Sequence, residues 1–196
     1  MIEQGNLPTQ RVNISTQKML GGIGYILILM GWMPRIGTFL SLVGTALWFI
    51  SMYQLSNILG KPSIFRKVSI FLILGITSMV TAFAFAIMAG IMAGVSLSAS
   101  ARGETGAILG LGLGAAITII VTYAIIVVSA YFYKEAYYIL AQATTQNLFK
   151  IGGLLMFIGA ITIILFGLGL LLIIVSNIVL AVAFFKAPSE LEVQGA

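Results

Sequence analysis

Long apolar runs separated by short polar segments make up most of this 196-residue chain. A helix needs about 20 mostly apolar residues to cross the hydrocarbon core of a bilayer, which is ~30 Å thick. The pattern predicts an all-α transmembrane bundle of about six helices in three hairpins. The predicted helices cover residues 19–33, 36–56, 68–95, 105–133 (extending toward 143), 151–165 and 168–186.

Polar residues gather at the two ends of the chain. Residues 1–17 and 187–196 are expected to be polar tails on a single transmembrane domain, residues 18–186. The first run, Met19 to Met33, would be about 22 Å long as a helix, which is short for a full span. The terminal hairpins are therefore expected either to span the membrane or to be re-entrant.

Small residues recur at every fourth position in the two central runs. Residues four apart lie on nearly the same face of a helix, where small side chains let another helix backbone come close. We therefore expect these positions to form helix-packing grooves. They are Ser78, Ala82, Ala86, Gly90 and Gly94 in the first run, and Gly106, Gly110, Gly114, Thr118 and Thr122 in the second.

Composition agrees with a membrane protein and narrows its chemistry. Charged residues make up 8% of the chain and hydrophobic residues 60%, and the mean hydropathy is +1.13. Soluble domains average about 25% charged residues. The chain has no Cys and no His, and its five acidic residues are all Glu. Disulfides, Cys or His metal sites and His-based acid–base catalysis are thereby excluded.

The basic residues stand singly or in pairs beside the apolar runs, as membrane-surface anchors do. They are not arranged as a nucleic-acid patch, so we expect no nucleic-acid partner. Tyrosines beside Lys134 indicate an aromatic belt at the membrane surface, with a ligand-stacking site as the alternative. The expected anchors are Lys18, Arg66, Lys67, Tyr131, Tyr133, Lys134, Lys150 and Lys186.

The distribution of charge also predicts an orientation. If the six runs are hairpins, eight basic residues face one side of the membrane, and only Arg35 and Arg102 face the other. Short loops rich in Lys and Arg stay in the cytoplasm. Both termini are therefore expected to be cytoplasmic.

Within the apolar runs the sequence offers little reactive chemistry. No ionisable residue is expected in the middle of a span, and the hydroxyls there have no base beside them. We therefore predict no catalytic residues, no metal, no cofactor and no enzyme. Asn177 is the most polar residue well inside the last run. A buried amide needs a partner, so it is expected to bond to another helix, with solute binding as the alternative.

Several apolar and glycine-rich segments together resemble a known family. The family is a small prokaryotic, mostly archaeal, group of polytopic membrane proteins catalogued as domain of unknown function 996. The resemblance implies a prokaryotic plasma membrane and brings no activity, ligand or catalytic residue. The segments that carry it are Lys18–Gly24, Ser63–Phe65, Ser129–Lys134, Leu148–Lys150, Gly153–Leu155, Ile158–Ala160 and Ala181–Phe185.

The absence of reactive groups, the short extramembrane parts and the packing grooves favour one function. We expect an accessory or scaffolding component of a larger membrane assembly. It would have the lipid bilayer, and membrane proteins or a second copy of itself, as partners. The alternative is a small-solute or ion permease whose path is lined by Ser78, Thr118, Thr122 and Asn177, because hydroxyl and amide groups can line a pore without charges.

Overall fold

The computed structural model describes the backbone of residues 9–100, 105–165 and 167–194, and the side chains of residues 11–91, 114–165 and 167–191. The chain forms two compact units. One combines its two ends, Met1–Ser69 and Tyr131–Ala196, and the other is the middle segment, Ile70–Ala130.

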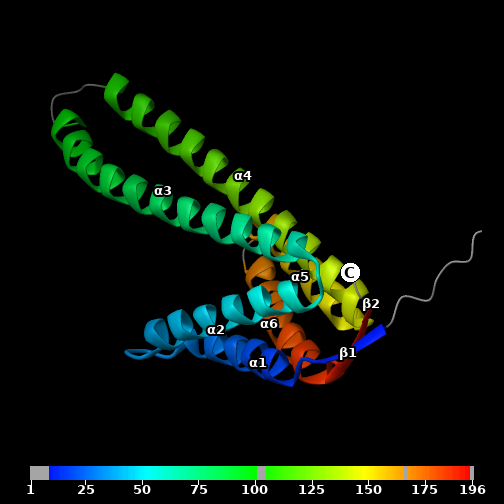
Figure 1. Ribbon diagram of the computed structural model, residues 1–196. Helices are drawn as coiled ribbons and strands as arrows, with labels where there is room; N and C mark the ends of the chain where they lie inside the picture. The colour runs from blue at the N-terminus through cyan, green and yellow to red at the C-terminus, as the bar shows by residue number, and fades with distance from the viewer. Residues whose placement is uncertain (1–8, 101–104, 166, 195–196) are drawn as a thin grey trace, which may run out of the picture. The chain divides into compact units, whose positions relative to one another are not determined.

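Six α-helices make up most of the described chain, as the sequence predicted (Figure 1). A short 3₁₀ helix, η1 (Met30–Trp32), follows the first of them. The α-helices are α1 (Ser15–Leu29), α2 (Gly37–Ile58), α3 (Pro62–Ser100), α4 (Thr105–Thr144), α5 (Asn147–Thr162) and α6 (Leu168–Lys186).

Helix α3 extends at both ends beyond the predicted range, residues 68–95, whereas α4 ends one residue past its predicted extension toward 143. Helix α3 begins at Pro62, since proline is well suited to the first turn of a helix, where its missing N–H leaves no bond unmade. Helix α4 continues past its charged residues to Thr144, and Thr145 ends it with a left-handed backbone (φ 54°). Polar and charged side chains on the helix surface do not interrupt the backbone hydrogen bonds, so hydropathy alone predicted too short a range for α3.

Within the described residues, four helices are long and apolar enough to cross a membrane. They include α2 and α6 in full and long parts of α3 and α4. Helices α1 and α5 have 15 and 16 residues, or about 22–24 Å at 1.5 Å per residue, and are shorter than a bilayer core. The architecture is that of a helical membrane protein.

Helices α1 and α2 form a hairpin, and the two helices cross where a glycine of one faces a glycine of the other. A Cβ atom at Gly24 would lie 2.8 Å from the Gly44 carbonyl oxygen, and one at Gly44 would lie 2.6 Å from the Gly24 carbonyl oxygen. Two turns farther from the connection, the Ser51 hydroxyl donates a 2.7 Å hydrogen bond to the Gln17 carbonyl. Close backbone approach and an interhelical hydroxyl bond therefore hold this hairpin together.

Helices α5 and α6 form a second hairpin built in the same way. Gly159 and Gly169 face each other, since a Cβ atom at either would lie less than 3 Å from the other's carbonyl oxygen. The Ser176 hydroxyl donates a 2.7 Å bond to the Gly152 carbonyl. The spacing is the same in both hairpins. The residue whose carbonyl accepts the serine bond comes seven residues before the first crossing glycine, and the serine comes seven residues after the second crossing glycine.

The two hairpins meet where α1 packs against α6. A Cβ atom at Gly21 would lie 2.3 Å from the Phe184 ring, and one at Gly22 would lie 2.7 Å from the Phe185 ring. Both glycines are buried. The aromatic side chains of α6 thus occupy the space that side chains on this face of α1 would need.

The ends of the chain, predicted as polar tails, carry a small antiparallel sheet instead. Strand β1 (Thr9–Asn13) pairs with β2 (Glu190–Gln194), with Val12 opposite Leu191. The Ile14 N–H donates to the Ser189 carbonyl at 2.8 Å, and Ile14 is buried. The strands were not predicted because their sequences are mostly polar. A short two-stranded sheet with one buried side needs few apolar residues.

In the middle unit, α3 and α4 run side by side as an antiparallel pair (Figure 1). The Ser129 hydroxyl of α4 donates to the Phe71 carbonyl of α3 at 3.1 Å. The side of α3 that is most covered in this unit includes Phe71, Leu74, Ser78 and Thr81, which follow a spacing of three or four residues.

The predicted packing grooves follow a different line. Ser78 is buried, but Ala82, Ala86 and Gly90 are exposed, and a Cβ atom at Gly90 or Gly114 would meet no atom within 4 Å. Four residues advance a helix by about 400°, so a stripe of every fourth residue turns about 40° per step away from the α4-facing side. Close packing at these exposed positions within the chain is therefore not observed.

Gly94, Gly106 and Gly110 lie outside the residues whose side chains the structure describes. Thr118 and Thr122 of α4 are half-buried. A packing role for the exposed small residues stays a prediction, and it requires contact with another molecule.

Candidate functional site

A cluster of buried aromatic side chains forms the centre of the unit that joins the chain ends. Tyr25 comes from α1, Trp48 from α2, and Tyr133 and Tyr137 from α4, and all four are buried. The Tyr133 and Tyr137 ring centroids are 4.7 Å apart, and Phe149 of α5 stacks on Tyr137 at 6.0 Å. Phe184 of α6 lies 5.8 Å from Tyr25. Five helices thus contribute to one aromatic cluster.

The polar atoms of these four residues bond to one another. The Trp48 indole N–H donates to the Tyr137 hydroxyl at 2.6 Å. The Tyr25 hydroxyl shares hydrogen bonds with the Tyr133 and Tyr137 hydroxyls. A buried polar group without a partner costs about 1–3 kcal/mol, so this mutual pairing favours one arrangement of α1, α2 and α4.

Tyr133 was predicted as a membrane-surface anchor, and that prediction is wrong. Its exposed fraction is 2%, and that of Tyr137 is 0%, whereas Tyr131 and Tyr138 are exposed as the belt interpretation requires. Tyr133 and Tyr137 are four residues apart and therefore share a helix face. The four-residue spacing is the sequence signal that distinguishes the buried pair, Tyr133 and Tyr137, from the exposed Tyr131 and Tyr138.

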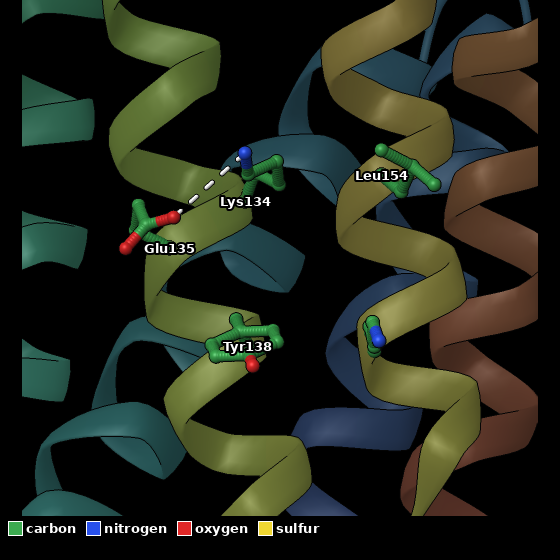
Figure 2. Close-up of a pocket in the computed structure, with 5 residues that line it drawn as sticks. Lys134, Glu135, Tyr138 and Leu154 are labelled. Carbon is green, nitrogen blue, oxygen red and sulfur yellow. Dashed lines mark ion pairs between the residues drawn. The ribbon is translucent and has the colours of Figure 1, made fainter.

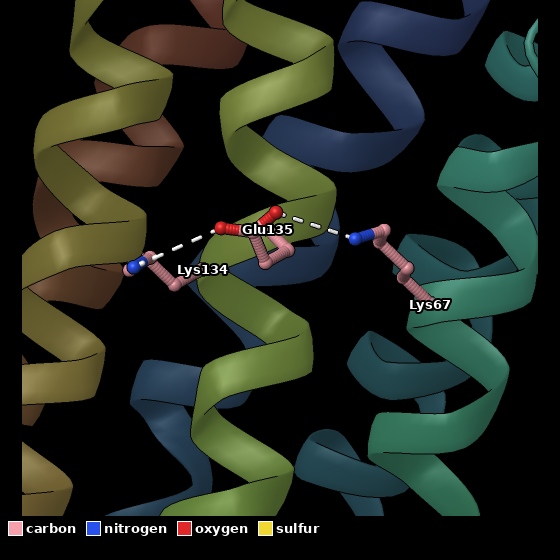
Figure 3. Close-up of polar contacts among 3 residues, drawn as sticks. All are labelled: Lys67, Lys134 and Glu135. Carbon is pink, nitrogen blue, oxygen red and sulfur yellow. Dashed lines mark hydrogen bonds and ion pairs between the residues drawn. The ribbon is translucent and has the colours of Figure 1, made fainter.

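Three charged side chains, two from α4 and one from α3, form a group of ion pairs (Figure 3). Glu135 stands between two lysines: its Oε2 is 3.3 Å from Lys67 Nζ of α3, and its Oε1 is 3.7 Å from Lys134 Nζ. All three side chains are about a quarter exposed. Lys67 and Lys134 were predicted as surface anchors; the structure adds that they share one carboxylate, which lies inside α4 and not at its end.

A shallow pocket of about 190 Å³ opens between α4 and α5 beside these charges (Figure 2). Lys134, Glu135 and Tyr138 line it from α4, and Lys150 and Leu154 line it from α5. The Lys150 ammonium lies 5.5 Å from the centre of the Tyr138 ring. The pocket therefore combines positive charge, an aromatic ring and an aliphatic side chain.

Other predicted anchors lie apart from the pocket. The Lys18 ammonium donates to the Ala187 carbonyl at 2.9 Å and to the Ser189 hydroxyl oxygen at 3.0 Å. It thus binds the segment between α6 and β2. Arg66 and Lys186 are exposed, as expected of surface residues.

Asn177, predicted as the buried polar residue of the last helix, is only half-buried. Its neighbour Ser176 is the fully buried one, with an exposed fraction of 0% and its bond to the Gly152 carbonyl. A hydroxyl is easier to bury than an amide, because a single bond to a backbone carbonyl uses its one donor. The sequence argument considered only polarity and so chose the wrong residue of the pair.

Among the hydroxyls proposed to line a permeation path, two bond to their own helix. The Ser78 hydroxyl donates to the Gly75 carbonyl at 2.8 Å, and the Thr118 hydroxyl donates to the Gly114 carbonyl at 2.9 Å. The Thr122 hydroxyl oxygen is buried and has no hydrogen-bond partner in the described part of the chain. Asn177 belongs to the other compact unit.

Comparison with known proteins adds a family but no activity. The model of the family described as "Protein of unknown function (DUF996)" matches residues 40–178. An uncharacterized protein of Methanocaldococcus jannaschii is 29% identical over 186 residues, which cover 93% of this chain and 97% of that protein. No solved structure matches the chain.

Proposed function

This chain belongs to the family described as protein of unknown function DUF996, and we propose that it is an accessory or scaffolding component of a larger membrane assembly. It lies in the prokaryotic plasma membrane as a multi-pass protein and has no catalytic machinery of its own. The observation that carries this proposal is the exposure of α3 and α4 in the middle unit.

In the most apolar stretch of each helix, 6% of the α3 residues and 11% of the α4 residues are buried. The corresponding shares are 28% in α2 and 33% in α6. Lipid can cover such a surface, but lipid alone does not require small residues on it. Ala82, Ala86 and Gly90 leave one exposed strip of α3 almost flat, and a flat strip lets another helix backbone approach closely. We therefore assign the strip to an integral membrane partner.

The test is gentle extraction from the native membrane followed by mass spectrometry of the proteins that co-migrate. Ala86→Leu places a bulky side chain on the strip, and Ala84→Leu places the same side chain about 200° around the same helix. Both positions are exposed, so both variants are expected to fold. We expect a stoichiometric partner with the wild-type chain and with Ala84→Leu, and its loss with Ala86→Leu.

Two results would contradict this proposal. The wild-type chain could migrate without any stoichiometric partner, or both leucine variants could retain the partner equally well. In the first case the protein does not act as an assembly component. In the second it does, but the small-residue strip is not the contact.

The second candidate function is a small-solute or ion permease. The specific observation that favours it is the Thr122 hydroxyl oxygen, which is buried and has no hydrogen-bond partner among the described residues. A passing solute would provide one. Flux into liposomes that Thr122→Val alters would favour this candidate, whereas liposomes without flux above the protein-free background would exclude it.

A further inference from the structure

We propose that the pocket between α4 and α5 binds the phosphate group of an anionic membrane lipid. This role goes beyond assembly, because it concerns the lipid and a different unit of the chain. It rests on four features of the pocket: its charge balance, its apolar side, its place along the helices and the close packing of its two walls.

Positive charge exceeds negative charge around the pocket. Lys134 and Lys150 line it, and Lys67 lies just beyond Glu135. Glu135 is the acidic residue in this group and is shared by Lys67 and Lys134. Three ammonium groups and one carboxylate leave a net charge of +2. The Lys150 ammonium lies 5.5 Å from the centre of the Tyr138 ring, and an ammonium has three N–H groups with which to donate to an anion.

Part of the α5 wall of the pocket suits an aliphatic chain. Leu154 lies one turn after Lys150 on α5 and faces Lys134 and Tyr138 of α4 across the pocket (Figure 2). Ile151 and Ile158 continue an exposed apolar surface along the same helix. A free phosphate would use only the lysines, whereas an anionic lipid would use the lysines and this apolar surface together.

The pocket also lies where charge gives way to apolar sequence. No charged residue occurs between Thr105 and Phe132 on α4, or between Ile151 and Phe185 on the α5–α6 side. Lys134 and Lys150 each border one end of these apolar stretches. Lipid headgroups meet a membrane protein at this level, and lysines there attract anionic lipids.

Close packing of α5 against α4 beside the pocket fixes the distance between its two walls. A Cβ atom at Gly153 would lie 2.9 Å from the Tyr137 Cβ and 3.3 Å from the Lys134 Cα. Helix α5 thus contacts the backbone of α4 at the residue that carries one of the lysines. The backbones that carry the two lysines are therefore packed together before a ligand binds, so the helices need not be brought together on binding, which lowers its cost.

The experiment measures lipid binding to the purified full-length protein in a neutral detergent by native mass spectrometry. The probes are phosphatidylglycerol and phosphatidylcholine with identical acyl chains. A lysine near the surface contributes about fivefold to the affinity for an anionic lipid. We expect phosphatidylglycerol to bind more tightly than phosphatidylcholine, and Lys150→Gln to weaken phosphatidylglycerol binding about fivefold.

Lys186→Gln is the matched control, because it removes the same charge from an exposed lysine outside the pocket. It should leave the affinity unchanged. Glu135→Gln should act in the opposite direction and tighten phosphatidylglycerol binding, since it removes the carboxylate beside the lysines. Circular dichroism and gel filtration of each variant show whether it is folded.

Three outcomes would overturn the proposal. The two lipids could bind equally well, or Lys150→Gln and Lys186→Gln could weaken binding to the same extent, which would indicate a general effect of surface charge. In the third, inorganic phosphate at millimolar concentration could displace phosphatidylglycerol completely. The pocket would then recognise a soluble phosphate and not a lipid.

Discussion

Tyr137 illustrates how a single residue can connect several helices. Its hydroxyl accepts a hydrogen bond from Trp48 and shares one with Tyr25, and its ring packs on Tyr133 and Phe149. The hydroxyl group is therefore as important to the packing as the ring. Because all of these groups are buried, removing one oxygen leaves the partners without access to water.

We expect Tyr137→Phe to lower the free energy of unfolding by about 1–3 kcal/mol, because the Trp48 N–H loses its acceptor. Tyr138→Phe is the matched control. Because Tyr138 is exposed, removing its hydroxyl leaves no buried group without a hydrogen-bond partner. Thermal unfolding in one detergent measures both. Equal unfolding temperatures for Tyr137→Phe and the wild type would contradict a stabilising role for the hydroxyl.

At the scale of elements, the hairpins depend on backbone contact and not on large apolar side chains. Gly24 and Gly44 bring the α1 and α2 backbones together, whereas Gly75 of α3 has open space around it. Two glycines in apolar helices can thus have opposite roles. Sequence does not distinguish them, because each is simply a small residue in a helical run.

Gly44→Ala should destabilise the protein, because its Cβ would lie 2.6 Å from the Gly24 carbonyl oxygen and 2.8 Å from the Ile28 nitrogen. Backbone atoms cannot move aside as a side chain can, and we expect a loss of about 1–3 kcal/mol. Gly75→Ala meets no atom and improves helix propensity, so it should be neutral or slightly stabilising. Thermal unfolding compares the two, and a lower stability of Gly75→Ala would contradict this distinction.

The elements were predictable from sequence where one property decided them. Long apolar runs gave the six helices and their order, because the membrane requires all backbone groups to bond within the helix. The interior was not predictable in the same way. Inward Tyr133 and outward Tyr131 are both tyrosines beside a lysine, and β1 and β2 pair across almost the whole chain. Such contacts depend on the positions of several helices at once.

For the whole molecule, the pairing of β1 with β2 places both described ends together. An even number of membrane crossings produces this arrangement. Which side they occupy is predicted from the charges, with both ends in the cytoplasm.

The absence of native cysteine allows a direct test of this orientation. Gln142 and Met33 are both exposed and are expected on opposite sides of the membrane. A membrane-impermeant maleimide should label Gln142→Cys in inside-out vesicles and Met33→Cys in right-side-out vesicles. The reverse pattern would invert the orientation, and labelling of both in the same vesicles would show that α2, α3 and α4 do not all cross the membrane.

The shared construction of the two hairpins has a consequence for engineering the chain. The crossing glycines are 20 positions apart in the α1–α2 hairpin and 10 apart in the α5–α6 hairpin, yet the glycine and serine contacts are the same. The connecting segment therefore does not determine how the helices dock. The chain between Met30 and Gly37 is thus a natural place for a protease site or an inserted reporter, and two separately expressed fragments divided there would retain the glycine crossing and the Ser51 hydrogen bond that join α1 to α2.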